Sequence, residues 1–261
     1  MPRAFWKGVI SFGLVAIPVK MSVATETKTI SFHLLHKKCL TRPKQVLHCD
    51  TDNEYFSLKD TVHGYEVAKD QYVVLEESDF KKVPIKTSHS IDILGFVETK
   101  EIDPIYYHSS HYVEPEELGA KPFQLLLKAL EKTGRVGIAK VAFQRREHLC
   151  SLRPFNDILV LQTMYFQDEI IKRDEPAGPQ IKVTETELDT ATSLIKAMAK
   201  QFKATDYKDE YEQALKKIIE SKVKGLQIAE PEESKVEVTD LMAALRESIK
   251  AAKKEKQPAV K

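Results

Sequence analysis

The chain has 261 residues, of which 40 are Lys or Arg and 39 are Asp or Glu, so its formal net charge is only +1. Its length is enough to bury one large core, and a hydrophobic content of 42% with 30% charged residues is typical of a globular protein. No apolar run approaches the roughly 18 residues that a membrane span needs, and the first residues lack the pattern of a secretory signal. We therefore expect a cytoplasmic protein with no membrane partner and with three reduced cysteines.

The charge is unevenly distributed along the sequence. Residues 121–153 hold eight Lys or Arg against two acids, whereas residues 76–117 hold ten acids against four Lys. This segregation allows one surface to be basic while the whole chain stays nearly neutral. Taken alone, however, the pattern favours solvated strand edges over a nucleic-acid surface.

The first segment has the pattern of a strand that is buried on both faces. Ile10, Phe12 and Leu14 recur at every second position, and the positions between them include Val9. Pro18 requires an edge or a bulge because it has no N–H to donate. These features predict the opening strands of a barrel-like sheet.

Up to about Phe166 the sequence predicts mainly short strands with one helix. The strand-like runs are 72–75, 91–97, 138–143, 149–155 and 158–165, and residues 145–148 are expected to form a hairpin turn. Pro122 suits the first turn of a helix and Gly134 suits the left-handed residue after its end. The apolar stripe of this helix consists of Phe123, Leu126, Leu127 and Leu130.

After a linker at residues 174–179 the pattern becomes helical. Thr184 and Glu187 form a capping box, and the stripe that follows comprises Leu188, Ala191, Ile195, Met198 and Phe202. A second amphipathic helix is expected from about Tyr207 to a stop at Gly225. Both stripes must be buried, either on the barrel or against a second subunit.

The end of the chain forms a third region. An acidic spacer at residues 230–234 precedes a short helix capped by Asp240, and a lysine-rich extension follows it. An isolated helix of this length is marginal in water. The segment is therefore either a docking peptide that folds on a partner or a frayed tail.

The search for reactive constellations gives little. His36, Cys39, His48 and Cys49 are close in sequence but lack a C-x-x-C pair, so zinc is the less favoured interpretation. His108 and His111 have metal-like spacing, yet they lie in an acidic segment with little strand pattern, where surface histidines are expected. Cys150 is expected to be a buried thiol. The common phosphate-binding, hydrolase and zincin motifs are absent from the sequence, so we expect a binding protein with no catalytic residues, metal or cofactor.

Many segments resemble bacterial Ku proteins, and they occur in the same order along the whole chain. They include F-W-K-G-V-I-S-F-G-L-V-A-I-P-V-K at 5–20, I-S-F-H-L-L-H at 30–36, E-I-D-P-I-Y-Y at 101–107, G-I-A-K-V at 137–141, L-R-P-F at 152–155 and D-L-M-A-A-L at 240–245. The resemblance implies an α+β, mainly β fold: a Ku-core-type β-barrel with an inserted bridge and a C-terminal helical arm, assembled as a ring-shaped homodimer.

The resemblance also implies a division into three parts and a function. Residues 1–180 would form the barrel core with the bridge at about 37–66, residues 181–228 the dimerisation arm, and residues 229–261 a flexible ligase-docking and basic tail. The homodimeric ring would bind the ends of double-stranded DNA without reading sequence. It would also recruit and stimulate the end-joining ligase LigD in non-homologous end joining, a form of DNA double-strand break repair. Many bacterial relatives carry additional cysteines in the bridge, where this chain has only Cys39 and Cys49.

Two sets of residues are expected to carry this function. The expected DNA contacts are Lys7, Lys20, Lys37, Lys38, Arg42, Lys44, Lys140, Arg145, Arg146 and Arg153. The expected ligase-binding residues are Leu241, Met242, Leu245 and Ile249. Two other interpretations stay open at this point: an open barrel platform for nucleic acid without a ring, and a metal-dependent enzyme that uses the histidines.

Overall fold

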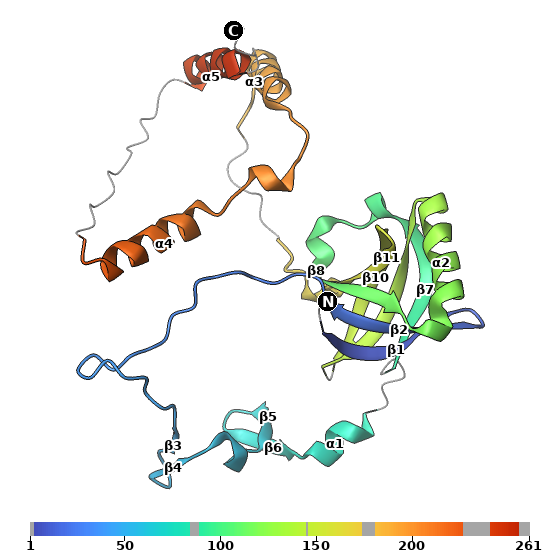
Figure 1. Ribbon diagram of the computed structural model, residues 1–261, viewed down its shortest axis with the longest axis vertical. Coiled ribbons are helices and arrows are strands. Elements are labelled where there is room, and N and C mark those ends of the chain that lie inside the picture. Colours follow the sequence, from blue (N-terminus) through green and yellow to red (C-terminus); the bar gives the residue numbers. More distant parts are fainter. Residues whose placement is uncertain (1–2, 84–88, 145, 174–180, 227–240, 256–261) are drawn as a thin grey trace. The chain divides into compact units, whose positions relative to one another are not determined.

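The computed structural model describes residues 3–83, 89–144, 146–173, 181–226 and 241–255 (Figure 1). The chain divides into two compact units, Met1–Lys172 and Arg173–Lys261. Across these described ranges, none of the helices combines the length and the apolar character that crossing a membrane would require.

The first unit contains a closed barrel of seven strands in the order β1-β2-β8-β11-β10-β9-β7 (Figure 1). β1 pairs with β7 in parallel, which closes the barrel, and the other neighbours pair antiparallel. The strands are β1 (Ala4–Phe12), β2 (Val15–Val23), β7 (Ser90–Glu98), β8 (Tyr107–Pro115), β9 (Arg135–Phe143), β10 (Arg146–Phe155) and β11 (Ile158–Met164). The expected barrel is therefore confirmed, but the first strand is not buried on both faces: Phe12 is half-exposed and Leu14 is fully exposed in the turn after β1.

The barrel core follows from alternation along these strands. In β2, Ile17, Val19 and Met21 are fully buried, whereas Lys20 between them is half-exposed. Pro18 pairs with Val9 of β1 and lies one residue before the pairing of β2 with β8 begins at Val19; its carbonyl accepts from the Glu116 N–H at 2.9 Å. The proline therefore stands at the end of the β2–β8 ladder rather than inside it.

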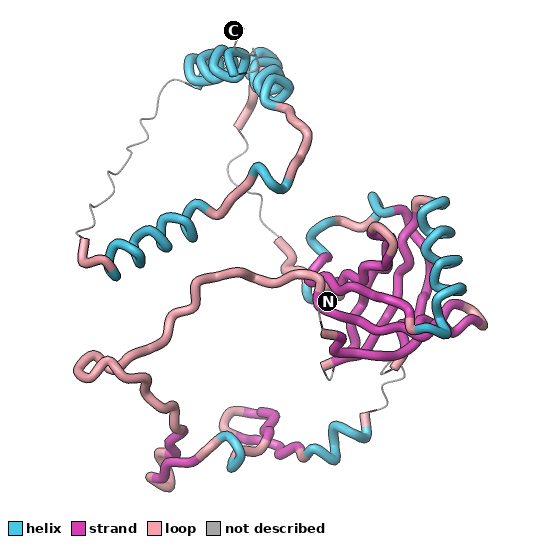
Figure 2. The backbone as a smooth tube through the Cα atoms, viewed as in Figure 1, coloured by secondary structure: helices cyan, strands magenta, loops and turns pink. Residues whose placement is uncertain are grey.

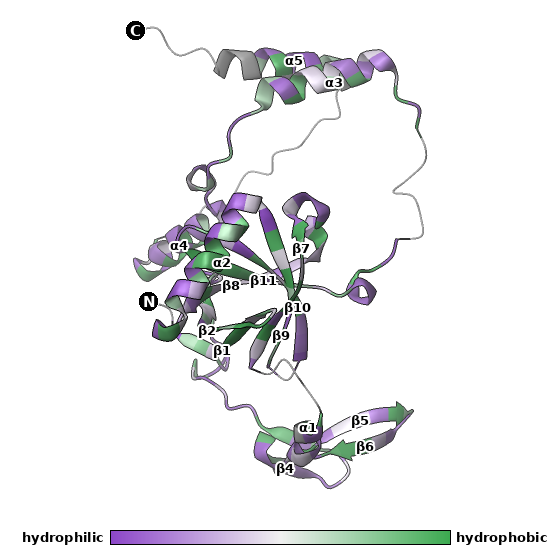
Figure 3. Ribbon diagram, turned by 90° about the vertical axis from the view of Figure 1, so that its right-hand side faces the viewer, coloured by the Kyte–Doolittle hydropathy of each residue, from purple (hydrophilic) through white to green (hydrophobic). Residues whose placement is uncertain are grey.

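Helix α2 (Ala120–Thr133) is the predicted helix, and it ends at Gly134 with φ of +63°. Its four expected stripe residues are all buried and join the barrel core. α2 contacts β2, β9 and β10. In Figure 3, hydrophobic colour marks the side of this helix that meets the strands.

One strand of the barrel is absent from the sequence-based prediction, as are the short strands β3, β4 and β5 of the insertion. Residues 107–115 form β8, between β2 and β11, although the segment is rich in polar residues. His111 on this strand is buried, so the expectation of surface histidines is wrong for His111 and holds for the exposed His108. The expected hairpin turn at residues 145–148 is also wrong in extent, because β10 already begins at Arg146 and continues through His148.

A long insertion separates β2 from β7. Residues 24–89 contain two small hairpins, β3 (Leu47–Cys49) with β4 (Glu54–Phe56) and β5 (His63–Ala68) with β6 (Gln71–Leu75), followed by α1 (Glu77–Lys82). Loops connect them, as Figure 2 shows in pink. No residue whose burial is described in this insertion is buried. From here on, the arm means residues 24–89, and not the helical dimerisation arm expected at 181–228. It is longer than the bridge of about 37–66 that the sequence suggested.

The second unit is helical. It contains α3 (Glu185–Met198), α4 (Glu210–Val223) and α5 (Leu241–Glu255). Thr184 and Glu187 form the predicted capping box, whereas Phe202 lies beyond the end of α3. The second helix begins at Glu210 rather than near Tyr207, and the predicted stop at Gly225 is confirmed by its φ of +69°. The linker at 174–179 and the acidic spacer with Asp240 lie outside the described residues.

Candidate nucleic-acid interface

Four expected DNA contacts lie in the arm, in the loop before β3. A tight turn positions the first two: the Leu40 N–H donates to the His36 carbonyl at 2.7 Å, and the His36 N–H donates to the Thr41 carbonyl at 2.8 Å. Leu40 adopts a left-handed φ of +54° in this turn. Lys37 and Lys38 therefore occupy its tip, and both are exposed.

These four cations have no acidic partner within the described ranges. The recorded ion pairs do not include Lys37, Lys38, Arg42 or Lys44. An exposed ammonium or guanidinium without a carboxylate keeps its full charge available for a phosphate. Among the expected contacts that the structure describes, those in the arm loop are consequently the ones without an acidic or hydrogen-bonding partner.

Among the expected contacts on the barrel, each described cation already has an ion-pair or hydrogen-bond partner. Lys7 Nζ lies 3.0 Å from Glu116 Oε1, and Lys20 Nζ lies 3.2 Å from Glu114 Oε2. Lys7 and Lys20 are direct neighbours across β1 and β2, and Lys20 faces Glu114 across β2 and β8. The two lysines are thus neighbours, and each has its own carboxylate, Glu114 on β8 or Glu116 just after it.

A second group of barrel cations comes from β9 and β10. Lys140 Nζ lies 2.9 Å from Glu147 Oε2, and Arg146 pairs with Glu169. The hydrogen bond from Arg146 is the main reason why the pKa of the Glu169 carboxyl is lowered. Arg145, another expected contact, lies outside the described residues.

Arg153 belongs to a more structured site. Its Nε donates to Gln162 Oε1 at 2.9 Å, and its guanidinium lies 5.6 Å from the centroid of the Phe155 ring. The Phe155 ring also stacks with the Tyr112 ring, with the two ring centroids 6.4 Å apart. A guanidinium fixed in this way presents its remaining N–H groups in a defined direction.

The ion pairs on the barrel have two opposing effects on the affinity for DNA. Exposed ion pairs contribute only about 0–1 kcal/mol each, so a phosphate can replace the carboxylate at little cost. The carboxylates nevertheless repel an approaching phosphate. The basic excess counted along residues 121–153 therefore does not form one continuous free surface.

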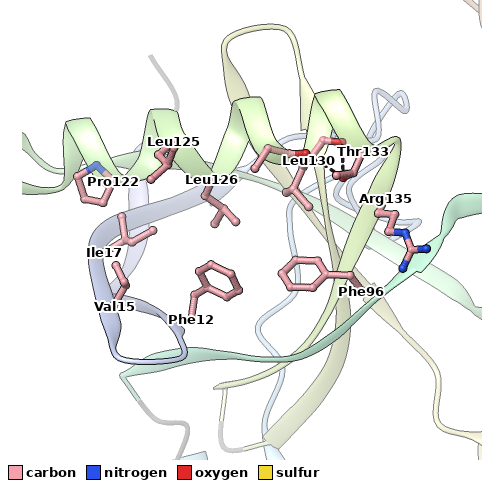
Figure 4. Close-up of a pocket in the computed structure, with 11 residues that line it drawn as sticks. Phe12, Val15, Ile17, Phe96, Pro122, Leu125, Leu126, Leu130, Thr133 and Arg135 are labelled. Carbon is pink, nitrogen blue, oxygen red and sulfur yellow. Dashed lines mark hydrogen bonds between the residues drawn. The ribbon is translucent and has the colours of Figure 1, made fainter.

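Sequence reasoning did not include the lysines of α2 among the contacts. Lys121, Lys128 and Lys132 are exposed, and their spacing of seven and four residues places them on one side of the helix. Beside them lies a hollow of about 430 Å³ between α2, the β1–β2 hairpin and β7 (Figure 4). Its lining is apolar except for Thr133 and Arg135 at one end. Because an apolar hollow does not suit phosphates, we do not expect these three lysines to contact DNA. They therefore serve as a control for the lysines of the arm.

The two cysteines of the arm have separate hydrogen-bond partners. His36 Nδ1 lies 3.1 Å from Cys39 Sγ, and the Cys49 thiol donates to Asp52 at 3.4 Å. Hydrogen bonding, led by the Thr41 hydroxyl, lowers the pKa of the Cys39 thiol to about 7. Within the residues that were described, no group of three or more His, Cys, Asp or Glu could hold a metal ion.

The buried His111 lies in an aromatic cluster of the barrel that includes the half-exposed Phe5. The His111 ring is 5.5 Å from Phe5 and 5.6 Å from Phe143, and His148 stacks on Phe143 at 4.2 Å. Burial is the main cause that lowers the pKa of both histidines. Cys150 is buried as expected, and burial raises the pKa of its thiol well above the usual range. These groups support the core rather than the charged surface.

The closed barrel, the long inserted arm and the exposed cations on that arm define a nucleic-acid-binding β-barrel protein. A sequence model of the Ku70/Ku80 beta-barrel domain matches residues 11–190. A relative from Solibacter usitatus is 42% identical over 263 residues, covering 100% of this chain and 98% of the relative. A relative from Archaeoglobus fulgidus is 41% identical, covering 96% of this chain and all of the relative.

A further relative, from Frankia casuarinae, is 42% identical over 96% of this chain, which spans 64% of its length. Each of the three is named "Non-homologous end joining protein Ku". The chain belongs to the Ku family, the DNA-end-binding proteins of non-homologous end joining. The resemblance found in the sequence is thereby confirmed.

Proposed function

We propose that this chain binds the ends of duplex DNA, without reading base sequence, as a homodimer whose two arms close a ring. We further propose that residues 241–249 recruit the end-joining ligase LigD. The observation that carries the first proposal is the arm: a segment of more than sixty residues, from 24 to 89, with no described buried residue.

The arm leaves large apolar side chains exposed to water, which is unfavourable unless another surface covers them. Phe32, Tyr55 and Tyr65 remain 70%, 74% and 66% exposed. Further apolar residues follow along β5 and β6, where Figure 3 also shows hydrophobic colour. Isolated two-stranded hairpins are at best marginally stable, so two such hairpins need another surface to cover them. A second copy of the chain supplies that surface in a self-complementary way, since a two-fold axis would bring each arm to the other subunit.

Two arms that cross in this manner enclose a space between the barrels. The free charges of Lys37, Lys38, Arg42 and Lys44 suit contacts with the phosphates of a duplex held there. Phosphate contacts carry no sequence information, which is the property required for repair of arbitrary breaks. A closed ring also retains DNA by topology, so a net charge of +1 is compatible with stable binding.

A comparison of linear and circular DNA tests the ring directly. We expect linear duplex to bind and a covalently closed circle of the same sequence to remain unbound at physiological salt. Native mass measurement should give a dimer that loads only on the linear form. Equal affinity for both forms, or a monomer on DNA, would support the open barrel platform instead.

The ligase proposal has its own test. Leu241→Asp with Leu245→Asp removes two apolar side chains of the expected docking face and leaves every lysine in place. We expect end binding to persist while ligase binding and stimulation of end joining fall to the level without this chain. A double variant that still stimulates ligation as well as the parent would place the docking face on other residues.

A further inference from the structure

The expected ligase-docking face is already occupied within the second unit. α5 contacts α3. Met242, Leu245 and Ile249 are each half-buried, whereas Arg246, at the edge of this face, and Lys250 are exposed. The covered side of α5 is therefore the side that the docking proposal assigns to the ligase.

α3 receives α5 on a small, polar-edged face. Thr190, Leu194 and Ala197 are half-buried and recur at spacings of four and three residues, so they share one side of α3. Arg246 and Ile249 of α5 line a common surface hollow with Asp189, Thr190 and Ser193 of α3. Asp189 supplies a negative charge at the site where α5 presents Arg246, so the contact is complementary in charge as well as in apolar area.

A different side of α3 stays free. Leu188, Ile195 and Met198, from the stripe predicted to enter a subunit interface, are 59%, 70% and 62% exposed. Leu194, by contrast, is half-buried on the side of α3 that carries Thr190. Holding α5 and forming a dimer through that stripe are thus compatible.

The contact between the two helices is also shallow. None of the residues described on α3 or α5 is fully buried. A helix of 15 residues is marginal on its own in water, so α3 stabilises α5 as a helix without enclosing it. An interface of this kind can open at low cost when a better partner is present.

We propose that α3 holds α5 in a closed form that covers the ligase-docking face, and that the ligase binds only after α5 leaves α3. The inference rests on the proposed role of α5 in ligase recruitment. The partner of the released α5 is a groove that accepts an amphipathic helix through Met242, Leu245 and Ile249. The apparent ligase affinity is then lowered by the fraction of molecules in which α5 is held.

A reversible cross-link tests the closed form. In full-length protein with Cys39→Ser and Cys49→Ser, the changes Asp189→Cys and Arg246→Cys place one thiol on each helix beside the shared hollow. A bismaleimide linker that contains a reducible bond then joins α3 to α5. The matched control carries Asp189→Cys and Lys196→Cys, which joins two positions on α3 and leaves α5 free.

We expect the cross-linked protein to bind LigD at least tenfold more weakly than the control, with recovery after reduction and with unchanged binding of linear DNA. Cross-linked protein that binds the ligase as tightly as its reduced form would overturn the proposal. If the reduced protein and the control both fail to bind ligase, the proposed ligase function has failed, and a second measurement decides the contact itself.

That measurement is amide hydrogen exchange of residues 242–249 in the free protein. Asp189→Lys places a second cation beside Arg246 and should release α5, so exchange in this segment should be several-fold faster than in the parent. Glu220→Lys, the same charge change on α4, is the control and should leave exchange unchanged. Equal exchange rates in Asp189→Lys and the parent would show that α3 does not hold α5.

Discussion

Replacing Lys37 and Lys38 by Gln should change how DNA binding depends on salt. Both side chains are exposed at the tip of the arm turn, and neither has an ion pair within the described ranges. The substitutions therefore remove two positive charges and little else, and the free energy of unfolding should change by less than about 0.5 kcal/mol. Any change in binding then reports the phosphate contacts alone.

The expected magnitude follows from counterion release. Each phosphate contact contributes about 0.9 to the slope of log affinity against log salt, so two contacts contribute about 1.8. A homodimer carries each substitution twice, so the slope should fall by about 3.6 when both arms touch the duplex. Between about 50 and 200 mM salt the parent should then lose about 150-fold more affinity than the variant, against about 12-fold more if only one arm makes contact.

Fluorescence anisotropy with a short blunt duplex, titrated at four salt concentrations, measures this slope. The control is Lys121→Gln with Lys128→Gln, which makes the same charge change on α2 beside the apolar hollow. We expect the slope of the control to match that of the parent. An unchanged slope in the arm variant, or an equal fall in the control, would refute the placement of the interface on the arm.

Three further results are expected. Glu116→Gln should free Lys7 from its partner at 3.0 Å and raise affinity for DNA ends at low salt, with the free energy of unfolding changed by less than about 1 kcal/mol; unchanged affinity would place that lysine away from the duplex. Gly8→Ala should lower the free energy of unfolding in urea by about 1–3 kcal/mol, because the new Cβ would lie 2.3 Å from the His89 carbonyl oxygen. In the control Gly95→Ala the new Cβ meets nothing within 4 Å, and the free energy of unfolding should change by less than about 1 kcal/mol. Because the pKa of buried His111 is lowered, the unfolded chain binds more protons than the folded one just below pH about 6.5, and the free energy of unfolding should fall as pH decreases in that window. His111→Gln should make this fall less steep.

The sequence alone determined the local elements. The alternating pattern around Ile10, the helical stripe from Phe123 to Leu130 and the glycine stops at 134 and 225 depend only on neighbours within a few residues. The segments shared with Ku proteins, taken together, were sufficient for the family. These features are local or are read directly from residue order, so no tertiary information was needed to recognise them.

The tertiary structure decided what depends on partners distant in sequence. β8 carries too many polar residues to be recognised as a strand, yet β2 and β11 complete its hydrogen bonds and the core buries His111. Whether each cation is ion-paired could likewise not be predicted from the sequence. Lys7 and Glu116, for example, are separated by more than a hundred residues and meet only when the barrel closes. The same reason applies to α5, whose apolar face is legible in the sequence but whose contact with α3 exists only in the folded unit.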